Sequence, residues 1–213
     1  MNWSVRRGFN WTIVAGAVAW GLALVAGFLA ISSYQLSPGD AGLAVESWPT
    51  GSRIALAGDR PTLIMAAHPR CPCTRASVGE LARILARCEG RVAAYILIFI
   101  PEDADGPWRQ AAGSSRFAAI PGVQPIEDPG GREAARLGAR TSGHVALYAP
   151  DGRLLFRGGI TGARGHEGDN RGREAVVALI RGDSLDPAEH PVFGCPIFDS
   201  FQPPTTRLAA CKD

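Results

Sequence analysis

The chain has 213 residues, of which 46% are hydrophobic, and a formal net charge of +2. Its charges are of mixed sign without long basic runs, so nucleic acid is not expected as a partner. Five cysteines are too few for a disulfide scaffold and cannot all pair with one another, so at least one thiol is expected to be free or engaged elsewhere.

Residues 11–34 form an uncharged apolar stretch that is long enough to cross a membrane as a helix. Arg6 and Arg7 precede it and acidic residues follow it, so the positive-inside rule predicts a cytoplasmic N-terminus at residues 1–10. A buried core helix and a cleaved signal peptide are the alternatives. We favour an uncleaved, single-pass anchor in the cell inner membrane with the C-terminal domain in the periplasm, because no good small-x-small cleavage site precedes Ser32.

Residues 35–60 are rich in Gly, Pro, Ser and Asp, which predicts a linker. Residues 61–182 predict one α/β domain. Its expected elements are strands at 62–67 and 92–100, helices at 75–88, 108–117 and 131–137, strands at 144–149 and 153–157, and a helix at 173–180. Two crossover units followed by a hairpin predict a mixed sheet. Residues 183–213 predict an irregular, Pro-rich tail.

The segment HPRCPCT, from His68 to Thr74, lies between the first strand and the first helix of this domain. A cysteine at such a turn has its sulfur near backbone N–H groups and near the positive end of the helix dipole, both of which favour the thiolate. Cys71 is therefore the predicted nucleophile. Its neighbour Arg70 is expected to lower the pKa of Cys71 further, as His68 would. A purely structural disulfide is the alternative.

The segment LIMAAHPRCPCTRA resembles the strand and active-site turn of extracytoplasmic thioredoxin-like proteins of the TlpA and ResA kind, whose pattern is roughly LVNFWATWCPPCR. The segment DPGGREAARLGAR resembles their region around the cis-proline. The segments HPRCPCTRAS, TSGHVALY, GGITGARGHEGDN and VFGCP resemble the membrane-anchored proteins labelled RedB. These resemblances imply a thioredoxin-like three-layer sandwich with a central mixed sheet. They also imply a thiol-disulfide oxidoreductase without a cofactor, whose partners are protein thiols or disulfides in the periplasm.

The resemblance places Cys71 at the attacking position and Pro72 at the residue that follows it. Thr74 stands at the usual resolving position, so Cys73 comes one residue early. We expect Cys73 to resolve the mixed disulfide on Cys71. A disulfide between these two cysteines would close a smaller ring than the usual CxxC ring, so it is expected to be strained and oxidising.

Gly143 falls on the position of the cis-proline, and His144 follows it and would tune the thiolate. The absent proline removes a block that keeps metals off the cysteines, and thiolates together with an imidazole suit Cu(I). The arrangement resembles the copper-delivering Sco proteins, so a copper chaperone that uses Cys71, Cys73 and His144 is an alternative. A peroxiredoxin-like peroxide reductase and a non-catalytic binding module also stay open.

Three further residues are candidates for the site. His166, in the glycine-rich loop at 158–172, is either a proton carrier, an extra ligand or a solvated loop histidine. Cys195 could fold back to resolve a mixed disulfide on Cys71. Equally, it could form a structural disulfide with Cys211, which is the pairing we favour from the sequence.

Overall fold

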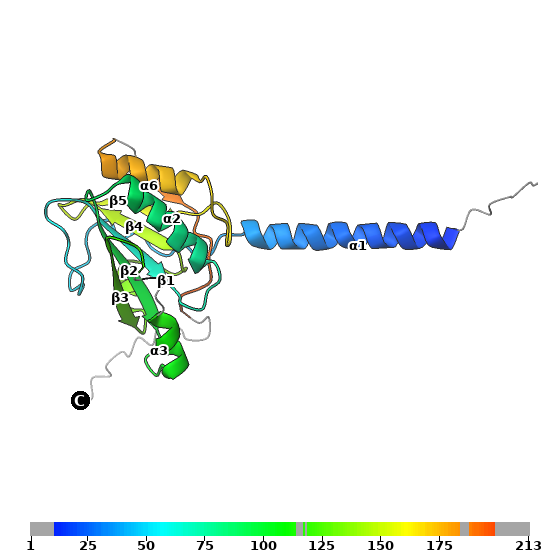
Figure 1. Ribbon diagram of the computed structural model, residues 1–213, viewed down its shortest axis with the longest axis horizontal. Helices are drawn as coiled ribbons and strands as arrows, with labels where there is room; N and C mark the ends of the chain where they lie inside the picture. Colours follow the sequence, from blue (N-terminus) through cyan, green and yellow to red (C-terminus); the bar gives the residue numbers. More distant parts are fainter. Residues whose placement is uncertain (1–10, 114–116, 118, 184–187, 199–213) are drawn as a thin grey trace, which may run out of the picture. The chain divides into compact units, whose positions relative to one another are not determined.

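The computed structural model describes residues 11–113, 117, 119–183 and 188–198 of the chain. The chain divides into two compact units, Met1–Leu36 and Ser37–Asp213. Figure 1 shows a single long helix in the first unit, and a sheet flanked by helices in the second.

The described part of the first unit is one continuous helix, α1 (Trp11–Leu36), of 26 residues. At 1.5 Å per residue such a helix is about 39 Å long, which exceeds the roughly 30 Å hydrocarbon core of a bilayer. It contains no charged residue, and its mean hydropathy is 2.2. The helix begins at the predicted residue and ends two residues later than predicted. It has the length and composition of a membrane anchor or of a signal sequence.

The second unit is built on a six-stranded mixed sheet with the order β3-β2-β1-β4-β5-β6. The strands are β1 (Thr62–Ala67), β2 (Ala93–Ile100), β3 (Val123–Pro129), β4 (His144–Tyr148), β5 (Leu154–Gly159) and β6 (Ala188–His190). β1, β2 and β3 are parallel, whereas β4 is antiparallel to both β1 and β5. The predicted crossover followed by a hairpin is confirmed.

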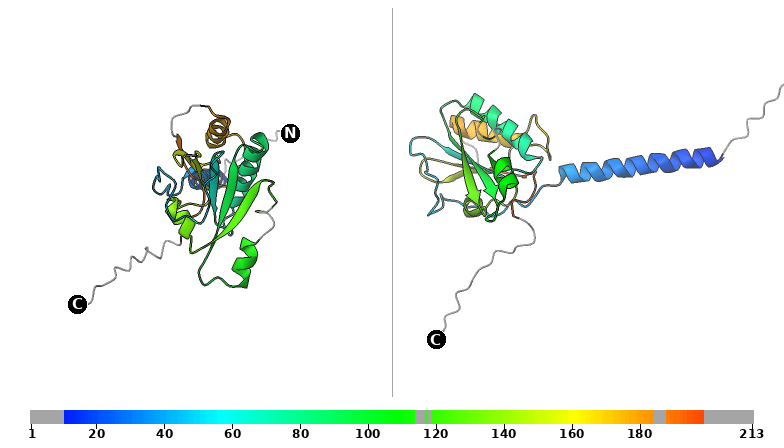
Figure 2. Two further views of the ribbon diagram at one scale, coloured as in Figure 1. Left: turned by 90° about the vertical axis from the view of Figure 1, so that its left-hand side faces the viewer. Right: turned by 60° about the horizontal axis from the view of Figure 1, so that its bottom comes forward.

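Helices and loops cover both faces of this sheet, which gives three layers (Figures 1 and 2). α2 (Thr74–Arg87) and α6 (Arg171–Arg181) lie side by side on one face, where their apolar side chains join alternate residues of β1 and β4 in one core cluster. α5 (Arg132–Arg136) covers the opposite face with a second, smaller cluster. α3 (Gly106–Ala112) contacts β2. The thioredoxin-like α/β fold is thereby confirmed.

The strand that leads into the cysteine turn lies in the middle of this structure. All six residues of β1 are buried, because its neighbours are β2 and β4 and both of its faces are covered. The short apolar run of β1 is therefore explained by burial on two sides. α2 follows after a short turn and begins at Thr74, one residue earlier than predicted.

Two of the six strands, β3 and β6, were not predicted from the sequence. β3 reads VQPIEDP and lies at the edge of the sheet, with several of its side chains exposed. It therefore carries no continuous apolar run, and Pro125 is acceptable there because an edge strand can leave one side unpaired. Its partner is β2, with Pro125 opposite Ile96.

The expected linker is residues 35–60. Its first two residues belong to α1, and residues 37–60 pack along the domain. Ile54 is 4% exposed, and the Trp48 ring meets the Tyr148 ring edge-on at 5.2 Å between centroids. Backbone hydrogen bonds join Trp48 to Gly152 and Leu154 to Glu46. Trp48, Ile54 and Leu56 join the smaller core cluster whereas Leu43 is exposed, so part of this segment is packed on the domain.

The expected irregular tail is also partly ordered. β6 adds a parallel strand beside β5, and Val192, Phe193 and Ile197 are buried. Residues 199–213, which include Cys211, lie outside the described residues.

Candidate thiol site

The candidate site lies at the turn between β1 and α2. The turn is closed by hydrogen bonds from the Cys71 N–H to the His68 carbonyl (3.0 Å) and from the Thr74 N–H to the Cys71 carbonyl (3.2 Å). Cys73 is the N-cap of α2 and makes no side-chain cap hydrogen bond. Cys71 and Cys73 are 3% and 7% exposed, so both thiols are largely covered by protein.

A third cysteine reaches this turn from the C-terminal segment. The sulfur of Cys195 lies 2.8 Å from the sulfur of Cys71, and the Cys195 N–H donates to the Cys71 sulfur at 3.4 Å. A disulfide bond is about 2.05 Å long, so the two sulfurs are close to bonding distance. The alternative pairing with Cys211 stays a prediction, because Cys211 lies outside the described residues.

The surroundings divide the cysteines into one acidic thiol and two weakly acidic ones. Burial raises the pKa of Cys71, but hydrogen bonds from the Cys195 side chain and from nearby backbone N–H groups outweigh burial and leave that pKa below its ordinary value. Burial and the hydrogen bond given to Cys71 raise the pKa of Cys195 to about 12. Burial and the charge of Cys71 also raise the pKa of Cys73. Cys71 is therefore the thiol that most readily becomes a thiolate.

Residues 192–198, which we call the C-terminal strap, bring Cys195 to Cys71. The Cys195 carbonyl accepts from the Ser142 N–H at 2.8 Å, and the Ile197 N–H donates to the Arg140 carbonyl at 2.8 Å. At the other end, the Gly39 N–H donates to the Val192 carbonyl at 2.8 Å. The strap therefore lies between the loop before β4 and the start of the second unit.

Arg164, in the glycine-rich loop at 158–172, also holds the strap. Its guanidinium donates to the carbonyl of Gly194, next to Cys195, and to the carbonyl of Ser37 at 3.1 Å. The positive charge of Arg164 acts to lower the pKa values of Cys73 and Cys195, although burial prevails at both. Sequence reasoning did not single out this arginine, because only the folded loop brings it to the cysteines.

The loop before β4 is the second wall of the site. Ser142 accepts the His68 N–H at 2.9 Å, and its hydroxyl lies 2.9 Å from that of Thr74, which in turn donates to the His68 carbonyl. Thr74, at the family's resolving position, therefore fixes the turn. Ser142 was missed because nothing near it in the sequence marks a contact with residues 68 and 74.

Gly143 occupies the expected position of the cis-proline, but with different geometry. Its φ is +90°, and the described residues contain no cis peptide bond. The Gly143 N–H donates to the Ala66 carbonyl at 2.8 Å, a hydrogen bond that a proline could not make. A side chain here would also meet the Ser77 hydroxyl at 2.6 Å. Glycine therefore lets this loop approach β1 and α2 closely.

His144 does not lie at the thiols. Alternation along β4 places it on the face of Ala146 and Tyr148, opposite the face covered by α2. It is 2% exposed, and its Nδ1 has no hydrogen-bond partner. Burial, assisted by the charge of Arg157, lowers the pKa of His144 to about 4, so the ring is neutral at neutral pH. The expected tuning of Cys71 by this imidazole has no supporting contact.

Two other residues of the turn face an aromatic cluster. The His68 ring stacks on Phe99 at 5.5 Å and meets Trp108 edge-on at 5.4 Å between centroids. The guanidinium of Arg70 lies 3.8 Å from the centre of the Trp108 ring, in a cation–π contact. Arg70 therefore contacts an aromatic ring. The expected lowering of the Cys71 pKa by Arg70 finds no support, because the main influences on that pKa come from burial, Cys195 and backbone N–H groups. Pro72, between the cysteines, is exposed.

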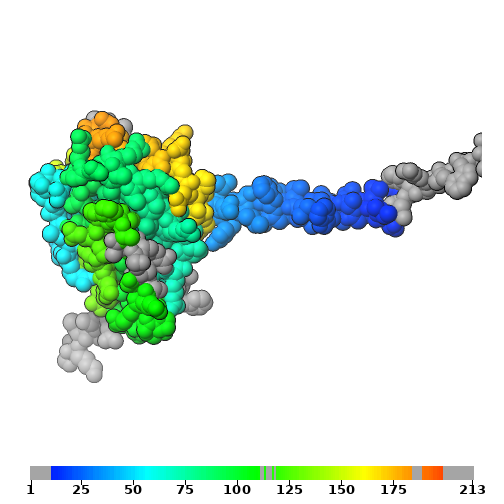
Figure 3. Space-filling view, in the orientation of Figure 1, coloured from blue at the N-terminus to red at the C-terminus, as the bar shows by residue number. Residues whose placement is uncertain are grey.

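The glycine-rich loop is held by a buried ion pair. Glu80 of α2 accepts from Arg173 of α6 at 2.7 Å and from the Gly168 N–H at 2.8 Å. The loop lies at the surface beside α2, where it is drawn in yellow in Figure 3. His166 is exposed in this loop, and its role stays a prediction.

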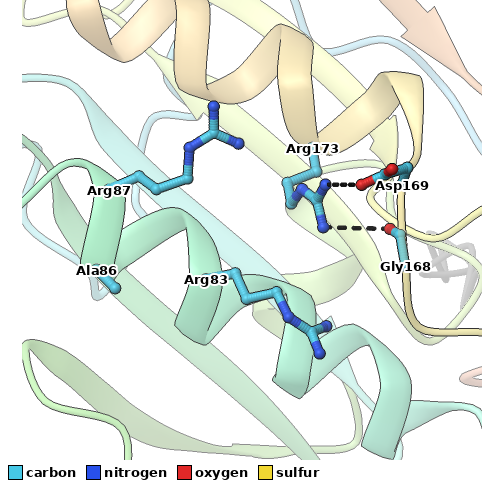
Figure 4. A pocket seen from close by; sticks show the side chains of 6 residues that line it. All are labelled: Arg83, Ala86, Arg87, Gly168, Asp169 and Arg173. Carbon is cyan, nitrogen blue, oxygen red and sulfur yellow. Dashed lines mark hydrogen bonds and ion pairs between the residues drawn. The ribbon is translucent and has the colours of Figure 1, made fainter.

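A groove beside this ion pair is lined by arginines but is not an anion site. Figure 4 shows Arg83, Arg87 and Arg173 around it, with Arg173 directed to Asp169 and to the Gly168 carbonyl. Arg83 pairs with Glu80 and Glu167, and Arg87 pairs with Glu174. Each arginine is thus already neutralised by carboxylates, which leaves no spare positive charge for a ligand.

The described residues do not gather the expected copper ligands. Within them, no group of three His, Cys, Asp or Glu side chains is arranged to hold a metal ion. Cys71 and Cys73 share the turn at the start of α2, whereas His144 lies on the other face of the sheet.

Comparisons with known proteins bear on the fold. The sequence matches no protein-family model and none of the curated proteins. Among solved structures, an uncharacterized conserved protein from Geobacillus kaustophilus has a TM-score of 0.54 and 17% identity, over 76% of this chain and 92% of its own. A hypothetical protein from Sinorhizobium meliloti has a TM-score of 0.53 and 20% identity, over 76% and 93%. At these identities the likeness concerns the fold alone.

A secreted disulfide oxidoreductase from Mycobacterium tuberculosis, described as homologous to E. coli DsbE, is similar with a TM-score of 0.42 and 16% identity, over 67% of this chain and 98% of its own. A score of this size carries no argument about activity. The fold and the site together define a thioredoxin-like domain with a thiol centre at the turn between β1 and α2.

Proposed function

We propose that this protein is a thiol-disulfide oxidoreductase in which Cys71 is the attacking cysteine. The observation that carries the proposal is the placement of Cys71: it precedes α2, its pKa is lowered, and a second thiol lies 2.8 Å from its sulfur. A thiolate of lowered pKa beside a second thiol is the arrangement that thiol-disulfide exchange needs, because one sulfur attacks and the other resolves.

The chemistry balances without a cofactor. The Cys71 thiolate attacks one sulfur of a partner disulfide, which forms a mixed disulfide and releases the other partner sulfur as a thiolate. A second cysteine of this chain then attacks Cys71, so the partner leaves as a dithiol and the two cysteines become a disulfide. The reverse sequence oxidises a partner dithiol. Backbone N–H groups at the turn stabilise the Cys71 thiolate whenever it is the leaving group.

The partners of this proposal are protein thiols or disulfides outside the cytoplasm. One observation and one general rule support that location. α1 has the properties of a membrane anchor or a signal sequence, and protein disulfides form and persist mainly in oxidising compartments outside the cytoplasm. We place the domain in the periplasm with α1 as a single-pass anchor in the inner membrane, as in the TlpA, ResA and RedB proteins that the sequence resembles. The role of Cys73 within the CPC motif stays a prediction.

The test is catalysis of insulin reduction by dithiothreitol with the full chain in detergent. We expect the wild-type chain to accelerate precipitation of the insulin B chain, and Cys71→Ser to abolish the acceleration. Cys88→Ser is the matched control, because Cys88 is equally buried (1%) but lies in the apolar core away from the turn. Equal activity of Cys71→Ser and the wild type would overturn the proposal. Consumption of hydrogen peroxide without insulin reduction would point to a peroxide reductase instead.

A further inference from the structure

We propose that Cys195 is the resolving cysteine of Cys71, and that the C-terminal strap has to leave the turn before a partner can react. This inference rests on the proposed function and assigns the second cysteine of the exchange. The sequence predicted Cys73 for that role and favoured Cys211 as the partner of Cys195. The geometry of the described residues favours the pair Cys71 and Cys195.

The sulfurs of Cys71 and Cys195 lie close together. The two sulfurs are 2.8 Å apart, so formation of the bond requires a movement of less than about 1 Å. A Cys71–Cys73 disulfide would close a ring across a single intervening residue, Pro72, which stores strain and makes the bond easier to reduce. Of the two candidate disulfides, the one with Cys195 is therefore the less strained.

The strap limits access to the Cys71 sulfur. Cys71 is 3% exposed while the strap is in place, and its sulfur already touches the Cys195 sulfur and N–H. A partner disulfide has to bring a sulfur to bonding distance of Cys71, and there is no room for one beside Cys195. The strap therefore moves out for the first step of exchange and returns for the second.

The strap is held differently at Cys195 and on either side of it. Around Cys195 its polar contacts are hydrogen bonds to the loop before β4, at Arg140 and Ser142, together with the Arg164 guanidinium on Gly194. Phe193 and Ile197 on either side are buried, so the part that has to move is the short segment 194–196, while Ile197 stays in the core and β6 stays paired with β5. Arg164 is a positioning residue here: it holds the strap and favours the thiolate of Cys195 as that cysteine attacks.

With oxidised glutathione as the partner, both steps balance. The Cys71 thiolate attacks glutathione disulfide, forms a Cys71–glutathione disulfide and releases one glutathione thiolate. Cys195 gives its proton to solvent and attacks the Cys71 sulfur, which forms the Cys71–Cys195 disulfide and releases the second glutathione thiolate. The protein loses two electrons, and one glutathione disulfide becomes two glutathione molecules.

The test follows these species by mass spectrometry after acid quenching and alkylation of the full chain in detergent. The reduced wild type and Cys73→Ser are expected to form the Cys71–Cys195 disulfide with little mixed disulfide. Cys195→Ser is expected to accumulate the Cys71–glutathione adduct, by about tenfold or more over Cys73→Ser. Accumulation in Cys73→Ser, with a Cys71–Cys73 disulfide in Cys195→Ser, would overturn the inference and leave the proposed function intact. Absence of any glutathione on Cys71 in all three chains would overturn both.

A second pair of variants tests the strap itself. A Cβ at residue 194 would collide with the Ser142 carbonyl oxygen, so Gly194→Ala is expected to displace the strap and to speed alkylation of Cys71 by iodoacetamide several-fold. Gly58→Ala is the control, because a Cβ there meets nothing within 4 Å. Equal alkylation rates in both variants would show that the strap does not cover Cys71.

Discussion

The buried ion pair between Glu80 of α2 and Arg173 of α6 fixes the glycine-rich loop that carries Arg164, and its contribution to stability can be measured. Glu80 is completely buried and Arg173 is 8% exposed, with 2.7 Å between the paired atoms. Glu80→Gln keeps the size of the side chain but removes its charge. Loss of one member of a buried pair costs about 3–5 kcal/mol. Arg173 keeps exposed partners in Asp169 and Glu174, so we expect a loss near the lower limit, about 3 kcal/mol.

The assay is urea unfolding of the full chain in detergent, followed by circular dichroism. Arg83→Gln is the matched control, because Arg83 binds the same carboxylate at 2.6 Å but its side chain is 47% exposed. An exposed pair contributes about 1 kcal/mol or less, so the control is expected to unfold almost as the wild type does. A loss below about 1 kcal/mol in Glu80→Gln would refute the view that this pair fixes the glycine-rich loop.

Three further predictions concern the thiols, His144 and Gly143. The pH midpoint for alkylation of Cys71 by iodoacetamide is expected below the ordinary cysteine pKa of about 8.5. In Cys195→Ala, which lacks the neighbouring thiol, the midpoint is expected to be higher than in the wild type. Identical midpoints in the two chains would contradict the role of that hydrogen bond. Burial lowers the pKa of His144 from 6.5 to about 4, so below pH 6.5 the unfolded chain takes up the proton first. Between pH 6.5 and about 4, the wild type should therefore lose about 1.4 kcal/mol of unfolding free energy per pH unit relative to His144→Gln, and above pH 6.5 it should lose none. Urea unfolding at several pH values measures this difference, and parallel pH curves for the two chains would count against the buried, neutral ring. Gly143→Ala should cost about 1–3 kcal/mol in thermal unfolding, because its φ is +90° and a Cβ would lie 2.6 Å from the Ser77 hydroxyl; an unchanged melting temperature would refute this reasoning.

The central part of the fold was predictable because its signals are local. β1 and β2 are short apolar runs that burial on both faces explains, and the Pro150-Asp151-Gly152 turn marks the hairpin between β4 and β5. β3 was not predictable in this way. Its exposed edge position lets it carry Pro125 and charged residues, so its sequence resembles that of a loop.

The cysteine that we propose as the attacking one could be located from the sequence, because the strand, turn and helix that surround it are continuous in sequence. Cys71 has the lowered pKa expected at the start of α2. The sulfur that lies 2.8 Å from its own comes from Cys195, 124 residues later, and no local pattern reports such a contact. The role expected of His144 stays a prediction: its place beside Gly143 suggested the site, and alternation along β4 puts its side chain on the face of Ala146 and Tyr148.

The most direct test of the central claim is a redox titration of the full chain in glutathione buffers, with alkylation and mass spectrometry to count free thiols at each cysteine. The account predicts one reversible two-electron transition in which Cys71 loses its free thiol together with one other cysteine, while Cys88 stays reduced throughout. Cys71→Ser should abolish the transition. A Cys71 thiol that stays free at every glutathione ratio would contradict a thiol-disulfide oxidoreductase.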